Sequence, residues 1–207
     1  GARRTAPAAL RNAGPILEVV RAHLPAAGGR GAGAGAEVLE VASGTGQHAA
    51  HLGAALPGAR IQPSELTAEA FPSICAWSEG VANVAEPVEL DAAAPPAEWP
   101  VAGRRFDLVL CCNLTHISPW ESTLGLLRGA GAVLGAGGKL LLYGPFAVDG
   151  APTTESNAAF DRSLRERDPR RGYRDVADVA REAEDQLLFL VERRDMPANN
   201  FTLVFER

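Results

Sequence analysis

Short apolar runs and amphipathic segments alternate along most of this chain. The apolar runs predict strands, in chain order, at 37–42, 60–63, 87–90, 106–112, 138–143, 187–193 and 201–206. The amphipathic segments predict helices at 13–23, 47–56, 67–79, 119–134, 156–167 and 175–186. In the first helix Ile16, Leu17, Val20 and Leu24 are spaced for one buried face, and Pro72 interrupts the third helix near its start.

The alternation of strand and helix is typical of βαβ units in a mainly parallel sheet. Segment 106–112, FDLVLCC, is apolar enough to be buried on both faces of such a sheet. The linker 195–200 is too short for a parallel crossover, so the last two strands are expected to be antiparallel neighbours. We therefore predict an α/β fold with a Rossmann-like, doubly wound, mainly parallel seven-stranded sheet whose last strand is antiparallel.

The whole chain, residues 1–207, is interpreted as one domain. Residues 1–36 supply the first helix and a glycine-rich loop, and 37–207 supply the core. Segment 28–35, GGRGAGAG, cannot hold regular structure. Too little chain precedes it to form a core, so we expect an expanded loop at this point and not a domain boundary.

Composition and charge exclude several classes of protein. The net charge of −5 and the mixed signs of segment 162–171 disfavour nucleic acid and anionic membrane surfaces as partners. No apolar stretch approaches the ~20 residues needed to span a bilayer. The three cysteines, Cys75, Cys111 and Cys112, lack the spacing of a metal finger. We expect a cytoplasmic protein without a metal site.

The most informative local pattern is segment 38–46, VLEVASGTG, in which a strand runs directly into a turn that opens a helix. Gly44 and Gly46, preceded by Ala42 and Ser43, allow a tight turn and the close approach of a ligand. Glu65 follows the second strand, about 20 residues later, where a carboxylate can accept hydrogen bonds from both hydroxyls of a ribose. A tight turn without any ligand would also fit the glycine pattern alone.

Glu40 narrows the choice of ligand. A dinucleotide places its pyrophosphate at this turn, and a carboxylate there would repel it. S-adenosylmethionine (SAM) has no phosphate and carries a sulfonium and an ammonium group, which an acid beside the turn would attract. We therefore predict SAM as the cofactor in preference to a nicotinamide dinucleotide. Asp91 is placed to reach the adenine amino group, and His48 is close enough to the turn to contact the cofactor.

Further motifs give the chain a resemblance to a known family. They are, as they stand here, 42–49 (ASGTGQHA), 62–64 (QPS), 113–120 (NLTHISPW), 142–146 (LYGPF), 167–169 (RDP) and 196–200 (MPANN). Over nearly its whole length the chain resembles the methyltransferase-like 26 family, small stand-alone proteins of unassigned substrate. The resemblance implies a class I methyltransferase fold, SAM binding and methyl transfer to an unidentified acceptor.

The chain departs from the family's expected pattern at a few positions. Ala42 stands where many class I enzymes have the first glycine of the turn, and Glu65 stands where aspartate is expected. Gln186 stands where a glycine would suit the end of a helix. None of these departures removes a binding group.

Candidate groups for the chemistry follow the fourth and fifth strands, because ligands bind outside the carboxyl ends of parallel strands. His116 is the candidate base, since its ordinary pKa near 6.5 suits proton abstraction, although it could instead hold the turn at 118–119. Asn113 could orient the acceptor and contact the cofactor. Tyr143 could assist, or could pack with its hydroxyl in solvent. Trp120 could wall the acceptor pocket, or could be a core aromatic at the start of a helix.

The loop 196–200 leaves the sixth strand at the same edge of the sheet. Asn199 and Asn200 are expected to face the acceptor together with Asn113 and His116, or else to cap their own turn.

Three functions remain open on this sequence. The first is a SAM-dependent methyltransferase that acts on a small-molecule or protein acceptor. The second is a SAM-binding protein without turnover that serves as an interaction module, and the third is a nicotinamide-dependent oxidoreductase. The chain has no Asn-Pro-Pro-Tyr run, which disfavours a nucleic-acid base as the acceptor.

Overall fold

The computed structural model describes residues 3–25 and 35–207. Most of the predicted glycine-rich loop, 28–35, lies outside the described residues. The helices are α1 Pro7–His23, α2 Gln47–Ala55, α3 Phe71–Ser78, α4 Trp120–Val133, α5 Glu155–Arg167 and α6 Val176–Glu184, with short 3-10 turns at Ala68–Ala70, Pro96–Glu98 and Pro197–Asn199. No helix in the described ranges has the length and apolar character needed to cross a membrane.

The main sheet confirms the predicted architecture. Its strands are β1 Glu37–Val41, β2 Arg60–Glu65, β3 Val88–Glu89, β4 Phe106–Cys112, β5 Leu134–Gly144, β8 Phe189–Met196 and β9 Asn200–Glu206. They lie in the order β3-β2-β1-β4-β5-β9-β8. β9 is antiparallel to both of its neighbours, and β8 therefore runs in the same direction as the first five strands. The strand order reverses between β1 and β4, which is where doubly wound sheets bind ligands.

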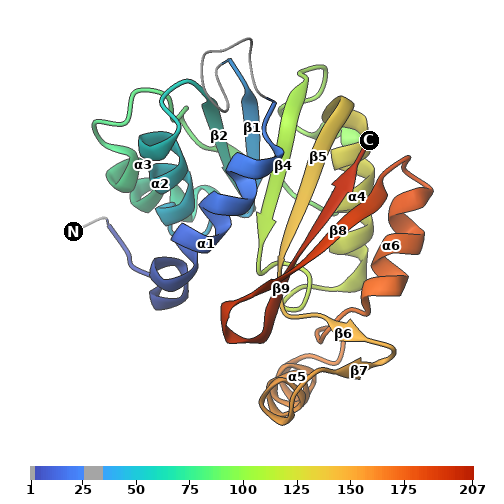
Figure 1. Cartoon of the computed structure of the whole chain (residues 1–207). Helices are drawn as coiled ribbons and strands as arrows, with labels where there is room; N and C mark the ends of the chain where they lie inside the picture. The colour runs from blue at the N-terminus through green and yellow to red at the C-terminus, as the bar shows by residue number, and fades with distance from the viewer. Residues whose placement is uncertain (1–2, 26–34) are drawn as a thin grey trace.

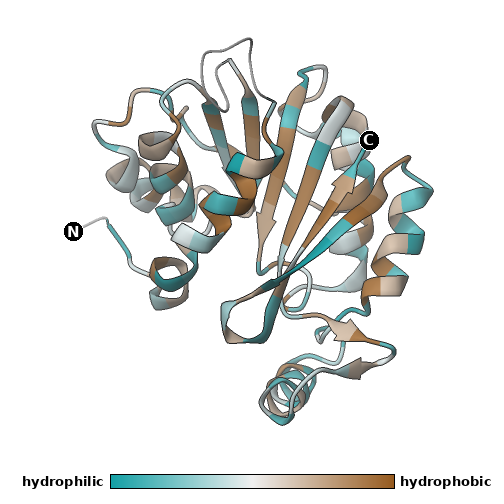
Figure 2. Cartoon of the chain, in the orientation of Figure 1, coloured by the Kyte–Doolittle hydropathy of each residue, from teal (hydrophilic) through white to brown (hydrophobic). Residues whose placement is uncertain are grey.

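Helices cover both faces of the sheet (Figure 1), with α1 and α2 on one face and α4 and α6 on the other. β4 is buried on both sides, as predicted: Leu108 and Leu110 face α1 and α2, while Val109 and Cys111 face α4 and α6. Figure 2 shows the same arrangement as hydrophobic colour along the central strands and hydrophilic colour on the outer surfaces of the helices. The packed core fixes the strand ends that form the site.

α1 and β5 begin four or more residues earlier than predicted, and α3 begins at Phe71, four residues later than predicted. α1 begins at Pro7, not at residue 13, because proline suits the first helical turn and Asn12 is held through its side chain by His48. β5 begins at Leu134, not at residue 138, and its glycine-rich start pairs irregularly with β4. In both cases tertiary contacts extend an element into residues that lack an apolar pattern.

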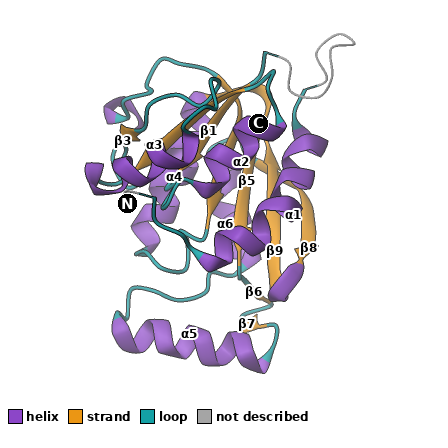
Figure 3. Ribbon diagram, turned by 90° about the vertical axis from the view of Figure 1, so that its left-hand side faces the viewer, coloured by secondary structure: helices purple, strands orange, loops and turns teal. Residues whose placement is uncertain are grey.

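A hairpin that the sequence did not predict, β6 Ala147–Val148 with β7 Ala151–Pro152, follows β5. Together with α5 and the loop that follows α5, it makes up residues 147–175, which we call the α5 module. Figure 3 shows α5 lying beyond the end of the sheet, apart from the two helical layers. Ala147, Leu164 and Tyr173 form a small core of its own. The module lies beside the carboxyl ends of the strands.

Candidate functional site

A cavity of about 560 Å³ opens at the carboxyl ends of β1, β2 and β4. Its walls come from segments 4–9, 42–48, 65–70 and 112–117. The predicted site residues that line it are Ala42, Ser43, Gly44, His48, Glu65 and Asn113. The cavity therefore lies where the strand order reverses, as expected for the ligand site of this fold.

The turn after β1 is held in left-handed backbone conformations. The φ angles are 58° at Ala42, 57° at Gly44 and 90° at Gly46. A Cβ at Gly44 would meet no heavy atom of the described residues within 4 Å, whereas a Cβ at Gly46 would lie 2.5 Å from the Cα of Ile74. Gly46 thus allows α3 to pack closely, and Gly44 is the residue whose missing side chain leaves open space. Gly46, predicted to allow the close approach of a ligand, is not part of the cavity wall and instead makes room for α3.

Glu40 lies beneath this turn with 1% of its surface exposed. Within the described residues, neither of its carboxylate oxygens has a hydrogen-bond partner. Burial raises the pKa of Glu40 to about 8. The negative charge of Glu65 adds to this shift, and the nearby polar groups of Ser43 and the Ala49 backbone, which lie outside hydrogen-bond geometry, only partly offset it. A buried, unpartnered carboxyl group of this kind is suited to a cationic ligand.

His48 connects Glu40 to the N-terminal helix. Its Nε2 lies 2.6 Å from Oδ1 of Asn12, and its Nδ1 lies 3.6 Å from Oε1 of Glu40. Burial, with a contribution from the charge of His51, lowers the pKa of His48 to about 4, so the ring is neutral at pH 7. With Nε2–H donated to Asn12, the unprotonated Nδ1 faces Glu40, and the proton of this pair resides on the carboxyl group.

The two acids predicted for the rest of the cofactor are placed differently. Glu65 lines the cavity, where its Oε2 accepts a hydrogen bond from the backbone N–H of Gly44 at 2.7 Å and its Oε1 accepts one from Leu66 at 2.9 Å. Asp91 is exposed and is not part of the cavity wall. Its Oδ1 accepts a hydrogen bond from the backbone of Ala93 at 2.8 Å, which caps its own turn.

Asn113 and His116 converge on the end of β5. A Cβ built at Gly144 would lie 3.5 Å from Oδ1 of Asn113 and 3.5 Å from Nδ1 of His116. His116 is 4% exposed, and its Nδ1 has no hydrogen-bond partner within the described residues. Burial and, secondly, the charge of Arg174 lower the pKa of His116 to about 4, so its ring is neutral at pH 7.

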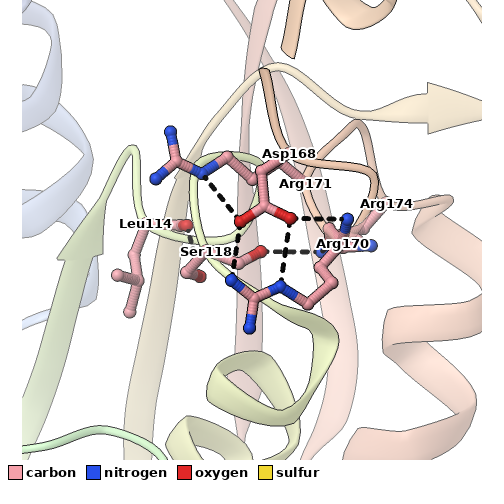
Figure 4. A network of polar contacts seen from close by, with 6 residues as sticks. All are labelled: Leu114, Ser118, Asp168, Arg170, Arg171 and Arg174. Atoms are coloured by element: carbon pink, nitrogen blue, oxygen red, sulfur yellow. Dashed lines mark hydrogen bonds and ion pairs between the residues drawn. The ribbon is translucent and has the colours of Figure 1, made fainter. Parts of the chain in front are cut away.

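The α5 module holds the segment that carries His116. Nε of Arg174 donates to the carbonyl of Thr115 at 3.0 Å, and its Nη2 donates to the carbonyl of Ser118 at 2.8 Å. The backbone N–H of Gly172 donates to the carbonyl of His116 at 3.0 Å. Figure 4 shows how Arg174 extends a network of arginines around Asp168 toward Ser118 and Leu114. The backbone of residues 115–118, and with it His116, is therefore held by both Arg174 and Gly172.

The remaining predicted residues lie outside the cavity wall. The hydroxyl of Tyr143 accepts a hydrogen bond from Nδ2 of Asn200 at 3.0 Å. Asn199 has an exposed side chain, and its carbonyl accepts from Nδ2 of Asn157 at 3.1 Å. Trp120 opens α4 and packs against the core under that helix. The loop 196–200 is thus attached to both β5 and the α5 module, and the roles of these residues stay predictions.

A family model described as "Protein of unknown function (DUF938)" matches residues 3–207. The chain belongs to this family. The description assigns no activity, so the finer resemblance to the methyltransferase-like 26 family stays a prediction.

Solved structures share the fold of this DUF938 member at low sequence identity. An O-methyltransferase family protein from Burkholderia thailandensis is similar with a TM-score of 0.74 and 20% identity, over 97% of this chain and 57% of its own. The mitomycin 7-O-methyltransferase gives 0.74 and 17%, over 97% and 54%. A methyltransferase of calicheamicin biosynthesis, in its SAH-bound form, gives 0.72 and 16%, over 95% and 54%. This chain spans little more than half the length of these proteins, and the likeness establishes the methyltransferase fold.

Sequence reasoning missed the N-terminal wall of the cavity. Arg4, Ala6, Ala8 and Ala9 line it. The chain before α1 runs along α3, where the indole N–H of Trp77 donates to the carbonyl of Arg4 at 2.7 Å, and the first turn of α1 follows directly. The residues before α1 show no apolar periodicity, so no sequence signal placed them at the site.

Proposed function

We propose that this DUF938 member is a SAM-dependent methyltransferase. The observation that supports this most strongly is the buried carboxyl group of Glu40, unpartnered within the described residues and lying beneath the turn that lines the cavity. A ligand with positive groups would favour the ionised form of this carboxyl group, whereas a pyrophosphate would be repelled by that form. The same observation argues against a nicotinamide cofactor.

The residues present suit this cofactor. Glu65 would hold the ribose hydroxyls, the open side of Gly44 would allow close approach to the backbone, and Glu40 would balance the positive groups. Asp91 caps its own turn and would have to rearrange to reach an adenine. When bound, the cofactor would supply a methyl group on a sulfonium, which is already activated for displacement.

The chain's own residues would then align the acceptor and remove its proton. Asn113 lines the cavity and faces Gly144, so its carboxamide would orient the acceptor. Nδ1 of His116, on the same side of Gly144, would receive the proton because the ring is neutral at pH 7. Arg174 would act as a positioning residue by fixing the backbone around His116.

We further propose membership of the methyltransferase-like 26 family, a small-molecule acceptor and a single-domain organisation. The cytoplasm is the proposed compartment, since Cys75, Cys111 and Cys112 are free thiols that suit a reducing environment.

Thermal unfolding with added ligands tests the proposal. SAM or its demethylated product S-adenosylhomocysteine should raise the melting temperature, with about 2.7 kcal/mol of stabilisation at 100 times the dissociation constant. NAD and NADP should leave the melting temperature unchanged. Stabilisation by NAD, or no response to millimolar SAM, would overturn the assignment.

A further inference from the structure

The α5 module brings an aromatic surface to His116. The rings of His116, Phe160 and Tyr173 meet edge to face, with centroid separations of 6.0, 6.1 and 6.2 Å. Tyr173 is buried, but Phe160 is 42% exposed. A partly exposed aromatic ring on α5 therefore lies beside the buried imidazole. Phe160 is not part of the small core of the module, so packing alone does not explain its position.

Two polar atoms lie close to this aromatic surface. Oδ1 of Asn113 and Nδ1 of His116 both face the side of Gly144 on which a Cβ would lie, at 3.5 Å each. Any larger residue at position 144 would fill that space. Nδ1 of His116 has no partner in the described part of the chain, and a buried polar atom in that state costs free energy unless a ligand satisfies it. The space beside Gly144 is thus suited to a group that donates a hydrogen bond to Oδ1 of Asn113 and, in the tautomer with the ring proton on Nε2, to Nδ1 of His116.

We propose that this space binds the hydroxyl or amino group of an uncharged, planar ring compound, and that Phe160 selects the ring. This inference rests on the proposed methyltransferase function and names the class of its acceptor. The acceptor's oxygen or nitrogen would form a bond to the methyl carbon while the bond between that carbon and sulfur breaks. The acceptor's proton would pass to Nδ1 of His116.

The surroundings of His116 and Asn113 favour an uncharged ring. Leu114 and Ile117 give the cavity apolar walls on the side that leads to Asn113. The guanidinium of Arg174 is already bound to backbone carbonyls and is not free to pair with an acidic acceptor. Burying a charged ring without a partner for its charge would cost more free energy than its other contacts contribute. An apolar ring with one polar group instead matches the usual composition of a small-molecule pocket.

Three fluorinated probes separate the polar contact from the ring contact. The full chain, saturated with S-adenosylhomocysteine, is titrated with 4-fluorophenol, 4-fluoroaniline and fluorobenzene, and binding is followed by ¹⁹F NMR. One satisfied hydrogen bond should make the phenol or the aniline bind about threefold to tenfold more tightly than fluorobenzene. The tighter of the two identifies oxygen or nitrogen as the acceptor atom. Equal affinities for all three, or no binding of any, would overturn the inference.

Variants assign the two contacts to residues. His116→Gln and Asn113→Gly should bring the three affinities close together, and glycine tolerates the φ of 59° at residue 113. Phe160→Ala should weaken all three probes about threefold or more. The matched controls are His51→Gln and Phe189→Ala, which change an exposed histidine and an exposed phenylalanine elsewhere. A Phe160→Ala protein that binds the probes like the Phe189→Ala control would contradict the proposed role of Phe160.

The two proposals fail separately. S-adenosylhomocysteine binding is measured first by calorimetry, and its absence would overturn the methyltransferase function itself. Binding of S-adenosylhomocysteine without preference for the phenol or the aniline would overturn only the acceptor class. The comparison of the three probes on the unmodified protein does not depend on any variant folding correctly.

Discussion

Replacing Glu40 by glutamine should stabilise the protein in the absence of ligand and weaken cofactor binding. Glutamine has nearly the shape of a protonated glutamic acid but does not titrate. In the native protein the carboxyl group is buried and has no hydrogen-bond partner in the described ranges, so its charged form is disfavoured. The substitution removes that penalty and also removes the group that would balance a cationic ligand.

The size of the effect follows from the pKa of Glu40, which is 4.5 in the unfolded chain and about 8 in the folded protein. Between these values the folded state holds a proton that the unfolded state has lost, so stability falls as pH rises, by about 1.4 kcal/mol per unit. Relative to the native protein, Glu40→Gln should therefore gain about 3 kcal/mol between pH 4.5 and pH 7. The gain should level off above pH 8.

Urea unfolding of both proteins at a series of pH values from 5 to 9 measures this difference. Glu18→Gln is the matched control, because Glu18 is an exposed carboxylate on α1. SAM affinity, measured by calorimetry, should fall at least tenfold in Glu40→Gln and stay unchanged in the control. A stability difference that does not vary with pH would show that Glu40 is not held protonated by burial, and the reasoning would be refuted.

Two further predictions concern the turn and the α5 module. Gly46→Ala should destabilise the fold by roughly 3 kcal/mol or more, because its Cβ would overlap the backbone of Ile74. Gly44→Ala should cost only the ~1–2 kcal/mol of placing alanine in a left-handed backbone conformation. Urea unfolding that ranks the two variants in the reverse order would contradict this prediction. Arg174→Met should lower the free energy of unfolding by about 2 kcal/mol, because the hydrogen bonds to the carbonyls of Thr115 and Ser118 are lost. Arg162→Met, at an exposed arginine on α5, serves as the control. Equal unfolding midpoints for the two variants would refute the proposed role of Arg174 in holding the segment that carries His116.

The sheet could be predicted because its strands are buried on both faces and so read as apolar runs. β4 is the plainest case, since FDLVLCC faces both helical layers. The short linker after β8 also fixed the antiparallel pairing of β9. The start of α1 could not be predicted, because contacts with α2, such as that between Asn12 and His48, and not periodicity, extend the helix to Pro7.

The site was predicted in part. Glu65 and Gly44 line the cavity because a turn after one strand and an acid after the next necessarily meet at the same edge of a parallel sheet. Asp91 follows the same rule, but its carboxylate is bound by its own turn, a local competition that strand spacing does not reveal. Arg4 reaches the cavity through an irregular segment, so only the tertiary structure could place it.

The central claim is that the cavity binds a positively charged cofactor beside Glu40, which is protonated in the free protein at pH 7 and ionises on binding. Isothermal titration of the full chain with SAM at pH 7, repeated in buffers of different ionisation enthalpy, tests it most directly. We expect one binding site and the release of close to one proton, because the carboxyl group, with a pKa of about 8, must ionise beside the bound cation. Absence of binding, or binding without proton release, would contradict the account.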